Sequence, residues 1–464
     1  MKDHRPPFVK VAWGLIIVFV LGLAILQAIP DRAKESNSED SDPIGLVLVQ
    51  LQAEYLLGIA QVLGAEQEIA TQAEFLDAGS IGQRQRYMAF MIAMGDPEAA
   101  KQSALRMRVE LEKAQRSLTE TQWKTQEYLD QRANGETIPD SVSLETQLGW
   151  FGILVEADQE KRREMGKVAS IKVFTAGAIM AFILFAAVVG FIGLIIMLVR
   201  TLNHQVQSGL NPEKPRHGIY AEVFALWLFL FMALITSAQW IGQQFVEDNP
   251  SLEMSFSLLA FFGSLCALFW ARFRGVSWRQ IRLDIGWTRG AGLFKEIFWG
   301  VSGYAMMLPF LGIGIIITMI LLFFQGTLAG GTGGDPFGGT SGGSHPIVLE
   351  IANGDLHLRI LLIVLATIAA PVVEETMFRG VLYRQLRSSS KNVTFALSVS
   401  GSVLVTSFIF AAIHPQGWAV IPALMGIAIG MNLLREWRGT LLPPMIVHGV
   451  SNGLVTSMML IFLS

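Results

Sequence analysis

The chain has 464 residues, of which 52% are hydrophobic and only 16% are charged, and its mean hydropathy is +0.46. The charged share lies well below the usual quarter, which argues against an ordinary water-soluble protein and favours a membrane protein. The formal net charge of −3 offers no basic surface for nucleic acid. Cys266 is the single cysteine, so an intramolecular disulfide and a zinc–cysteine site are both excluded.

The N-terminal residues 1–30 read as a membrane anchor. Basic residues precede an apolar run at Val11–Ile29. The run is long enough to span a bilayer, and Gln27–Pro30 lacks the small-x-small pattern of a cleavage site. We therefore expect an uncleaved anchor instead of a removed signal peptide.

Residues 31–170 predict an acidic helical domain outside the membrane. They hold 24 acidic and 15 basic residues, whereas the rest of the chain has a net charge of +6. The polar tract Asp31–Asp42 predicts a flexible lead, and from Ile44 apolar residues recur at helical spacing. Thr137–Ser141 should break the helices, and a further helix is expected from Ser143 into the second span. We expect an antiparallel helical hairpin or small bundle that offers a surface for a protein partner. The alternative is a passive helical spacer.

Apolar runs of spanning length predict about nine transmembrane helices, and hence an all-α polytopic bundle with an extra helical domain. Residues 171–289 contribute additional membrane helices and a basic loop, and residues 290–464 contribute a core. The expected spans are Val11–Ile29, Val173–Val199, Glu222–Phe245, Leu252–Ala271, Ile297–Phe324, Leu358–Met377, Phe395–Ile413, Trp418–Leu434 and Leu441–Leu463.

Loop charges predict the orientation of these spans. Basic residues fall in every second loop, including Arg272, Arg387 and Arg435, whereas the alternate loops carry acids such as Glu247 and Asp355. The positive-inside rule then places the N-terminus in the cytoplasm and residues 31–170 outside it. The expected location is the inner (plasma) membrane of a bacterial cell. The bilayer itself is one partner, and no nucleic-acid partner is expected.

The glycine-rich loop Gly326–His345 predicts a linker and no phosphate-binding site. A phosphate loop needs a defined glycine spacing that ends in a lysine and leads into a helix. The repeated glycines of this loop have no such lysine. A flexible connection between two spans is the better interpretation.

Two adjacent carboxylates, Glu374 and Glu375, follow the apolar run 360–373. Inserting each carboxylate at membrane depth costs about 2.5 kcal/mol or more of free energy. Such groups are therefore ion-paired, protonated, hydrated or part of a functional site. Arg379 lies four residues after Glu375, on the same helical face, and five after Glu374. We therefore expect Glu375 to pair with Arg379 and Glu374 to be left for general-base work on a water molecule. The alternative is a buried ion pair that only locks helices together.

Later spans add the polar groups that such chemistry needs. Phe410 stands four residues before His414, and His448 stands four before Asn452, so each pair projects from one helix face. Counting residues from the turn near Lys391 brings Glu374 to the level of Phe408–His414, whereas the level of His448 fits less well. Two histidines, an amide and an unpaired carboxylate in separate spans indicate a catalytic site.

These three motifs together resemble the CPBP family. It comprises the CAAX-processing and bacteriocin-processing intramembrane proteases, also called the Abi family, and includes the type II CAAX prenyl endopeptidases. The resemblance covers roughly residues 290–464. It implies a protease in which Glu374 activates water with help from His414, while His448 and Asn452 stabilise the oxyanion. By the same resemblance Glu375 and Arg379 hold the site and Phe410 packs beside it.

The sequence leaves two questions open. No His-Glu-x-x-His helix is present, but Glu374, His414 and His448 could bind a divalent metal such as zinc with one position open to water. We favour a metal-free site, so that no cofactor is required. The alternative functions are a non-catalytic member of the family, such as a bacteriocin self-immunity factor or scaffold, and a transporter with a proton relay. A transporter would favour inverted repeats, of which the sequence shows no convincing sign.

Overall fold

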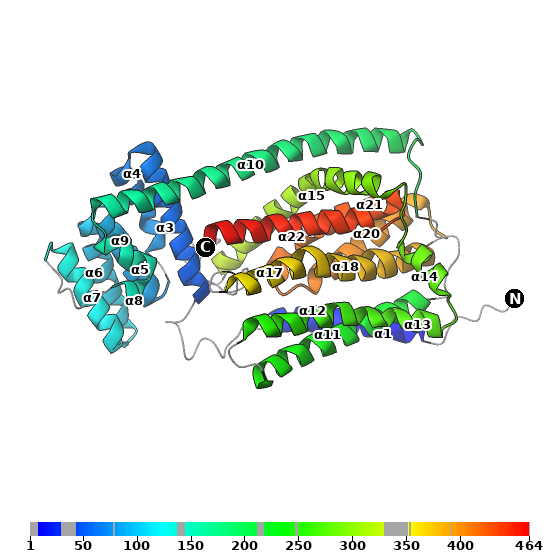
Figure 1. Ribbon diagram of the computed structural model, residues 1–464, viewed down its shortest axis with the longest axis horizontal. Helices are drawn as coiled ribbons and strands as arrows, with labels where there is room; N and C mark the ends of the chain where they lie inside the picture. Colours follow the sequence, from blue (N-terminus) through cyan, green and yellow to red (C-terminus); the bar gives the residue numbers. More distant parts are fainter. Residues whose placement is uncertain are drawn as a thin grey trace. The chain divides into compact units, whose positions relative to one another are not determined.

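The computed structural model describes residues 8–28, 43–77, 79–136, 144–210, 218–245, 249–328, 351, 354–390 and 392–463. These residues form helices and connecting turns without a strand, as the sequence predicts (Figure 1). The tract Asp31–Asp42, the break at Thr137–Ser141 and the glycine loop beyond Leu328 lie outside the described residues. Gly326–Leu328 themselves close a helix.

The chain divides into two compact units, which we describe separately. The first, here called the acidic unit, comprises residues 31–181 with 332–344 and 460–464. The second, here called the bundle unit, comprises residues 1–30, 182–331 and 345–459. Helix α10 (Gln159–Leu202) contributes residues to both units.

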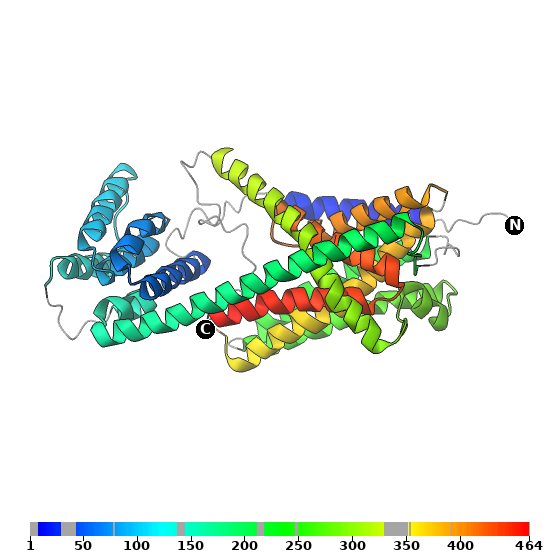
Figure 2. The same ribbon diagram turned by 90° about the horizontal axis from the view of Figure 1, so that it is seen from above.

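Short capped helices build the acidic unit (Figure 2). Ser80 and Thr119 each form a capping box with a glutamine three residues on, which satisfies free N–H groups where two helices begin. Buried apolar residues such as Phe90 and Phe151 fill its core. The elements are α3 (Pro43–Leu63), α4 (Glu66–Gln72), η1 (Ala73–Leu76), α5 (Ile81–Ala93), α6 (Pro97–Lys113), α7 (Glu120–Ala133), α8 (Glu145–Leu148) and α9 (Trp150–Glu156).

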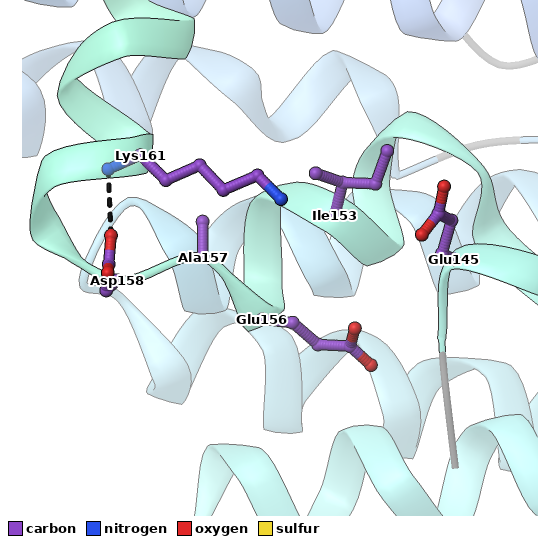
Figure 3. Close-up of a pocket in the computed structure, with 6 residues that line it drawn as sticks. All are labelled: Glu145, Ile153, Glu156, Ala157, Asp158 and Lys161. Atoms are coloured by element: carbon purple, nitrogen blue, oxygen red, sulfur yellow. Dashed lines mark hydrogen bonds between the residues drawn. The ribbon is translucent and has the colours of Figure 1, made fainter. Parts of the chain in front are cut away.

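The prediction of a single helix from Ser143 into the second span is wrong. The structure has α8, α9 and α10 in its place. Gly149 takes a φ of 60°, a left-handed conformation that an ordinary side chain disfavours, and Ala157 is extended. A hollow of about 270 Å³ opens at these breaks, with Glu145, Glu156 and Lys161 in its wall (Figure 3).

Longer helices build the bundle unit (Figures 1 and 2). In chain order they are α1 (Val9–Ala28), α11 (Ile219–Phe245), α12 (Pro250–Ser264), η2 (Leu265–Ala267), α13 (Leu268–Phe273), α14 (Trp278–Ile285), α15 (Leu293–Leu328), α17 (Leu356–Val364), η3 (Leu365–Ala369), α18 (Ala370–Glu375), η4 (Thr376–Leu382), α19 (Tyr383–Ser389), α20 (Phe395–Ala412), η5 (Trp418–Val420), α21 (Ile421–Arg438) and α22 (Leu442–Leu463). The elements η3 and η4 are π-helical, so α17 to α19 form one long helix.

Nine of the described helices are long and apolar enough to cross a membrane. Eight of them overlap expected spans. The ninth is Gly45–Leu63 in α3, which the sequence analysis assigned to the outer domain, whereas α1 retains only the shorter apolar stretch Val9–Leu23. The span expected at Leu358–Met377 continues to Ser389, because Arg379, Arg384 and Arg387 find partners inside the bundle unit.

Close helix packing and an aromatic cluster set the position of the central helices. A Cβ atom at Gly430 would lie 2.8 Å from Met307 Cγ, so α21 approaches α15 at a distance that only a small residue permits. The Phe378 ring on η4 meets Phe410 on α20 at 5.1 Å and Trp227 on α11 at 5.6 Å between centroids. These contacts bring η4, α20 and α21 together around the two carboxylates.

Candidate active site

The helix that carries the two carboxylates is wound irregularly on both sides of them. Glu374 and Glu375 end the short α-helical stretch α18, between the π-helical turns η3 and η4. A π-turn inserts an extra residue and thereby re-aims the side chains that follow, and such turns are frequent at functional sites. Pro371 lacks an N–H and is a sequence signal for the first irregular turn, whereas η4 has no comparable signal.

The expected pairing of Glu375 with Arg379 is present. Arg379 Nη1 donates to Glu375 Oε1 at 2.9 Å, and both side chains are fully buried. Arg379 Nη2 also donates to the carbonyl of Ala428 at 3.4 Å, and its guanidinium lies 4.5 Å from the centroid of the Phe410 ring. The arginine therefore joins η4, α20 and α21 at one point.

Glu374 faces both histidines. Its Oε2 atom lies 3.9 Å from His414 Nε2 and 4.0 Å from His448 Nε2. The same oxygen is buried and accepts no hydrogen bond from any residue that the structure describes. The doubt about the level of His448 is thus resolved, because α20 and α22 bring both imidazoles to one carboxylate.

The hydrogen bonds of the two Nδ1 atoms indicate which nitrogen of each imidazole carries the proton. His414 Nδ1 donates to the carbonyl of Phe410 at 2.6 Å, and His448 Nδ1 donates to Glu375 Oε1 at 2.8 Å. In a neutral imidazole the other nitrogen, Nε2, then carries a lone pair. Two imidazole nitrogens and one carboxylate oxygen consequently converge, and a water molecule, which has two O–H groups, can donate to two of the three at a time.

Phe410 and Asn452 complete the predicted set. The Phe410 ring packs at 4.5 Å from the His414 ring and 5.9 Å from the His448 ring, and so separates the imidazoles from Arg379. Asn452 Nδ2 donates to the carbonyl of Ala366 at 2.9 Å, within the π-helical turn η3. The structure therefore gathers Glu374, Glu375, Arg379, Phe410, His414 and His448 in one cluster, in which each contacts at least one other member, with Asn452 one turn along α22.

The three candidate metal ligands do not fit one metal ion as they are placed. Ligands of tetrahedral zinc lie about 3.3–3.5 Å apart, given bonds of about 2.0–2.1 Å. The Glu374 oxygen is 3.9–4.0 Å from the two imidazole nitrogens. No group of three His, Cys, Asp or Glu residues with metal-binding geometry occurs in the described part of the chain. The same spacing does allow a water oxygen about 2.8 Å from Glu374 Oε2 and from either imidazole nitrogen.

Sequence reasoning missed two groups that support this site. Thr376 follows the carboxylates, donates to the carbonyl of Val372 at 2.7 Å and accepts from Trp287 Nε1 at 3.0 Å. The hydrogen bond between His448 and Glu375 was also not foreseen. Neither has a signal in the sequence, because each joins segments separated by more than 70 residues.

Comparison with known proteins agrees with the motifs. Residues 356–454 match the family described as "Type II CAAX prenyl endopeptidase Rce1-like". The resemblance predicted from the three motifs is therefore confirmed for this segment. It contains all seven predicted site residues and lies within the bundle unit.

One relative is the "Membrane-embedded CAAX protease MroQ" of Staphylococcus aureus (strain USA300), which is 31% identical over 98 residues. The alignment covers 20% of this chain and 38% of the relative. No solved structure matches the chain. Together the family match and the relative favour a membrane-embedded, multi-pass protease, and the family match lies wholly within the bundle unit.

Proposed function

We propose that the chain is an intramembrane endopeptidase that hydrolyses peptide bonds of membrane-associated or leader-type substrates. One observation carries this proposal: Glu374 Oε2 and the Nε2 atoms of His414 and His448 converge with spacings of 3.9 and 4.0 Å. A water molecule between them can donate to Glu374 and to His414 Nε2 and accept from an imidazolium at His448, with the carboxylate in place as its base.

In the proposed reaction, Glu374 removes a proton from this water while the water oxygen attacks the carbonyl carbon of the substrate. The proton then passes to the leaving nitrogen as the carbon–nitrogen bond breaks. His414 orients the water, and its own orientation is set by the hydrogen bond to the carbonyl of Phe410. No step requires a metal, in keeping with the spacing of the three side chains.

His448 and Asn452 are the proposed oxyanion donors. An imidazolium at His448 donates from both ring nitrogens, and Glu375 would be the counter-ion of Nδ1. The Asn452 amide uses one N–H on Ala366 and has a second N–H to donate. Removal of one such donor costs about 10²–10³ in kcat.

The test is hydrolysis of a peptide library by the purified protein in lipid nanodiscs. Glu374→Gln should lower the rate by about 10²-fold or more, since it removes the general base and keeps the shape. Glu253→Gln, the same substitution in α12, is the matched control and should keep parental activity. Equal activity of Glu374→Gln and the parent would contradict the proposal. A folded parent without activity on any peptide would favour the non-catalytic alternative.

A metal requirement is tested in the same assay. Incubation with a chelator, followed by removal of the chelator, should leave the rate unchanged if the carboxylate and histidines act alone. Loss of activity that zinc restores would show that these side chains approach one another around a metal ion in the working enzyme. That result would contradict the proposed water geometry but would remain consistent with protease activity.

We further propose that the acidic unit lies outside the cytoplasm and binds the protein substrate or a partner. None of the predicted catalytic residues belongs to it. Ser117 is exposed and suits cysteine labelling, whereas the Ser80 hydroxyl caps α5. With Cys266 replaced by alanine, an impermeant thiol reagent on intact cells should label Ser117→Cys. Protection of that cysteine would reverse the proposed orientation.

A further inference from the structure

A line of buried polar residues runs along α20 towards the candidate active site. Ser398, Ser402, Thr406 and Phe410 follow one another at four-residue spacing along α20, so each lies about one turn after the one before, and His414 follows just beyond the end of the helix. The three hydroxyl residues are all buried. This line begins at a polar network and ends at the histidine beside Glu374.

Helix α21 presents a matching face. Asn432 Nδ2 donates to Ser407 Oγ at 3.0 Å and contacts the carbonyl of Val403 at 3.4 Å, both on α20. One turn earlier, the carbonyl of Ala428 accepts from Arg379, and one turn later Glu436 pairs with Arg387. We call this contact region between α21, η4 and α20 the polar seam.

Five side chains of the polar seam keep a buried polar atom that has no partner among the described residues. Two are donors, two are acceptors and one is a hydroxyl that can do both, and every one of these side chains is 0% exposed. The atoms are Glu375 Oε2, Arg379 Nε, Thr406 Oγ1, Asn432 Oδ1 and Arg435 Nη1. An isolated unsatisfied group costs about 1–3 kcal/mol, so five of them in one region require a shared explanation.

Among these five side chains, Arg435 has the greatest need for additional hydrogen-bond partners. Its fully buried guanidinium donates only to the carbonyls of Arg379, at 3.3 Å, and Asp284, at 3.2 Å. No carboxylate within the described residues forms an ion pair with it. A buried charge without a counter-ion needs solvation by other polar groups, and water supplies both donors and acceptors.

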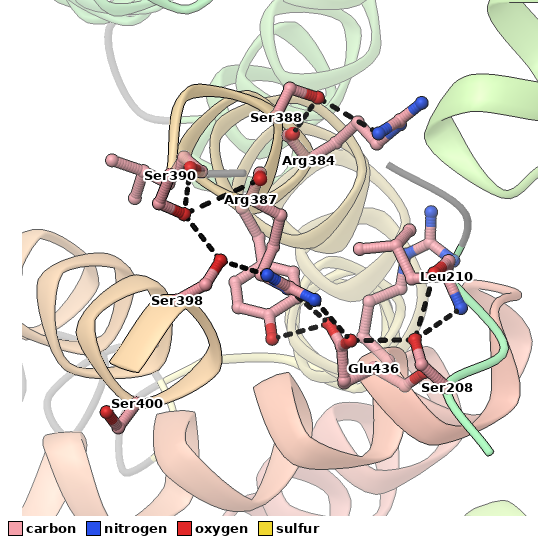
Figure 4. A network of polar contacts seen from close by, with 12 residues as sticks. Ser208, Leu210, Arg384, Arg387, Ser388, Ser390, Ser398, Ser400 and Glu436 are labelled. Carbon is pink, nitrogen blue, oxygen red and sulfur yellow. Dashed lines mark hydrogen bonds and ion pairs between the residues drawn. The ribbon is translucent and has the colours of Figure 1, made fainter. Parts of the chain in front are cut away.

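The far end of the polar seam is the network of hydrogen bonds around Glu436 (Figure 4). Glu436 accepts from Arg387, from Tyr383 at 2.9 Å and from Ser208 at 2.7 Å, while Ser398 bonds both Arg387 and Ser390. Ser208 and Ser390 are half-buried, so solvent meets the network there. The loops at this end are those whose basic residues predict the cytoplasmic side.

We propose that the polar seam binds a set of ordered water molecules and exchanges water between this end of the bundle unit and the active site. The exchange role rests on the proposed hydrolysis, which consumes one water for each peptide bond. At the inner end, Glu375 Oε2 meets the seam, and Glu375 Oε1 holds the histidine that faces Glu374. Water thus reaches the base without crossing the lipid-facing side of the helices.

Radical labelling with X-ray pulses tests the bound water, since it generates hydroxyl radicals from water in place. Met431 precedes Asn432 and is fully buried, and Met107 of the acidic unit is buried to a similar degree. The proposal expects oxidation of Met431 well above that of Met107. Equal protection of the two methionines would overturn it. The measurement is repeated in Glu374→Gln, because water binding does not depend on catalysis. The oxidation of Met431 therefore tests the bound water even if the proposed protease activity is absent.

The double variant with Thr406→Val and Asn432→Leu should lose the water bound in the polar seam. Oxidation of Met431 should then fall to the level of Met107. In the peptide assay, kcat should fall by about tenfold with an unchanged KM, the size of effect expected for one lost hydrogen bond in a relay. Thr406→Ser keeps the hydroxyl and should retain both readouts. If the double variant does not fold, Thr406→Val alone carries the test. A dried seam with full kcat would overturn the exchange role.

Discussion

The ion pairs of the two units have nearly equal lengths and very different surroundings. In the acidic unit, Lys124 meets Glu120 at 2.7 Å with side chains 56% and 82% exposed. In the bundle unit, Arg379 meets Glu375 at 2.9 Å with both side chains fully buried. Exposed pairs add about 0–1 kcal/mol, whereas removal of one member of a buried pair costs about 3–5 kcal/mol. The environment, and not the distance, therefore decides what such a contact does.

This contrast separates two uses of charge in one chain. On the acidic unit, charge keeps helices soluble and adds little to their packing. Inside the bundle unit, buried charge is costly, and buried groups such as Arg379 contact several elements at once. Glu436 alone joins Arg387, Tyr383 and Ser208. Substitutions in the two units should therefore differ strongly in effect.

The largest loss of stability is expected for Glu436→Leu. It would leave the buried guanidinium of Arg387 without its counter-ion and the Tyr383 hydroxyl without its carboxylate acceptor, at a cost of about 5 kcal/mol. Thermal unfolding in detergent measures it. Glu98→Leu, at an exposed pair with Lys101, is the control. Similar transition temperatures for the two variants would contradict the contrast between the units.

The Glu375–Arg379 pair should show strong coupling. Glu375→Ala and Arg379→Ala should each lower the free energy of unfolding by about 3 kcal/mol and reduce activity, because each leaves one charge buried alone. The double variant should lose less than the sum of the two single losses. Strict additivity would show that the two side chains do not act as a pair.

An intermediate effect is expected for Asp77→Asn in the acidic unit. Asp77 accepts from Arg106 Nε at 2.9 Å, from Arg106 Nη2 at 2.6 Å and from the hydroxyl of Ser103. The carboxylate is buried while the arginine is partly exposed, so the loss should be about 1–2 kcal/mol. Urea unfolding measures this loss. A loss as large as that of Glu436→Leu would mean that burial of the second partner is unimportant.

The smallest effect is expected for Lys124→Ala. The hydrogen bond from Lys124 lowers the pKa of the Glu120 carboxyl, so any stability from this pair is present above the unfolded-state pKa and is lost as the pH falls through the folded-state pKa. Both side chains are largely exposed, so the unfolding temperature should not change measurably. NMR titration should show the Glu120 pKa rising in the variant, and an unchanged pKa would mean that the pair is absent in solution.

Local spacing explains which parts of the site were predictable. The four-residue interval from Glu375 to Arg379 is a property of one helix, and so is the interval from Phe410 to His414. The break at Gly149 was missed because a helical apolar pattern continues on both sides of it. The π-helical turns were missed because their widening depends on neighbours, such as Asn452 bound to the carbonyl of Ala366.

Apolar run length, helical periodicity and the order of three motifs determined the all-helical membrane fold and the candidate site residues by themselves, since each acts within one segment. Only the tertiary structure decided that His448 bonds Glu375, that two imidazoles face Glu374, and that Arg435 and Asn432 are buried without full partners. These facts depend on which helices lie side by side. Contacts across 50 to 90 residues of chain come from packing, and sequence spacing within one helix carries no record of them.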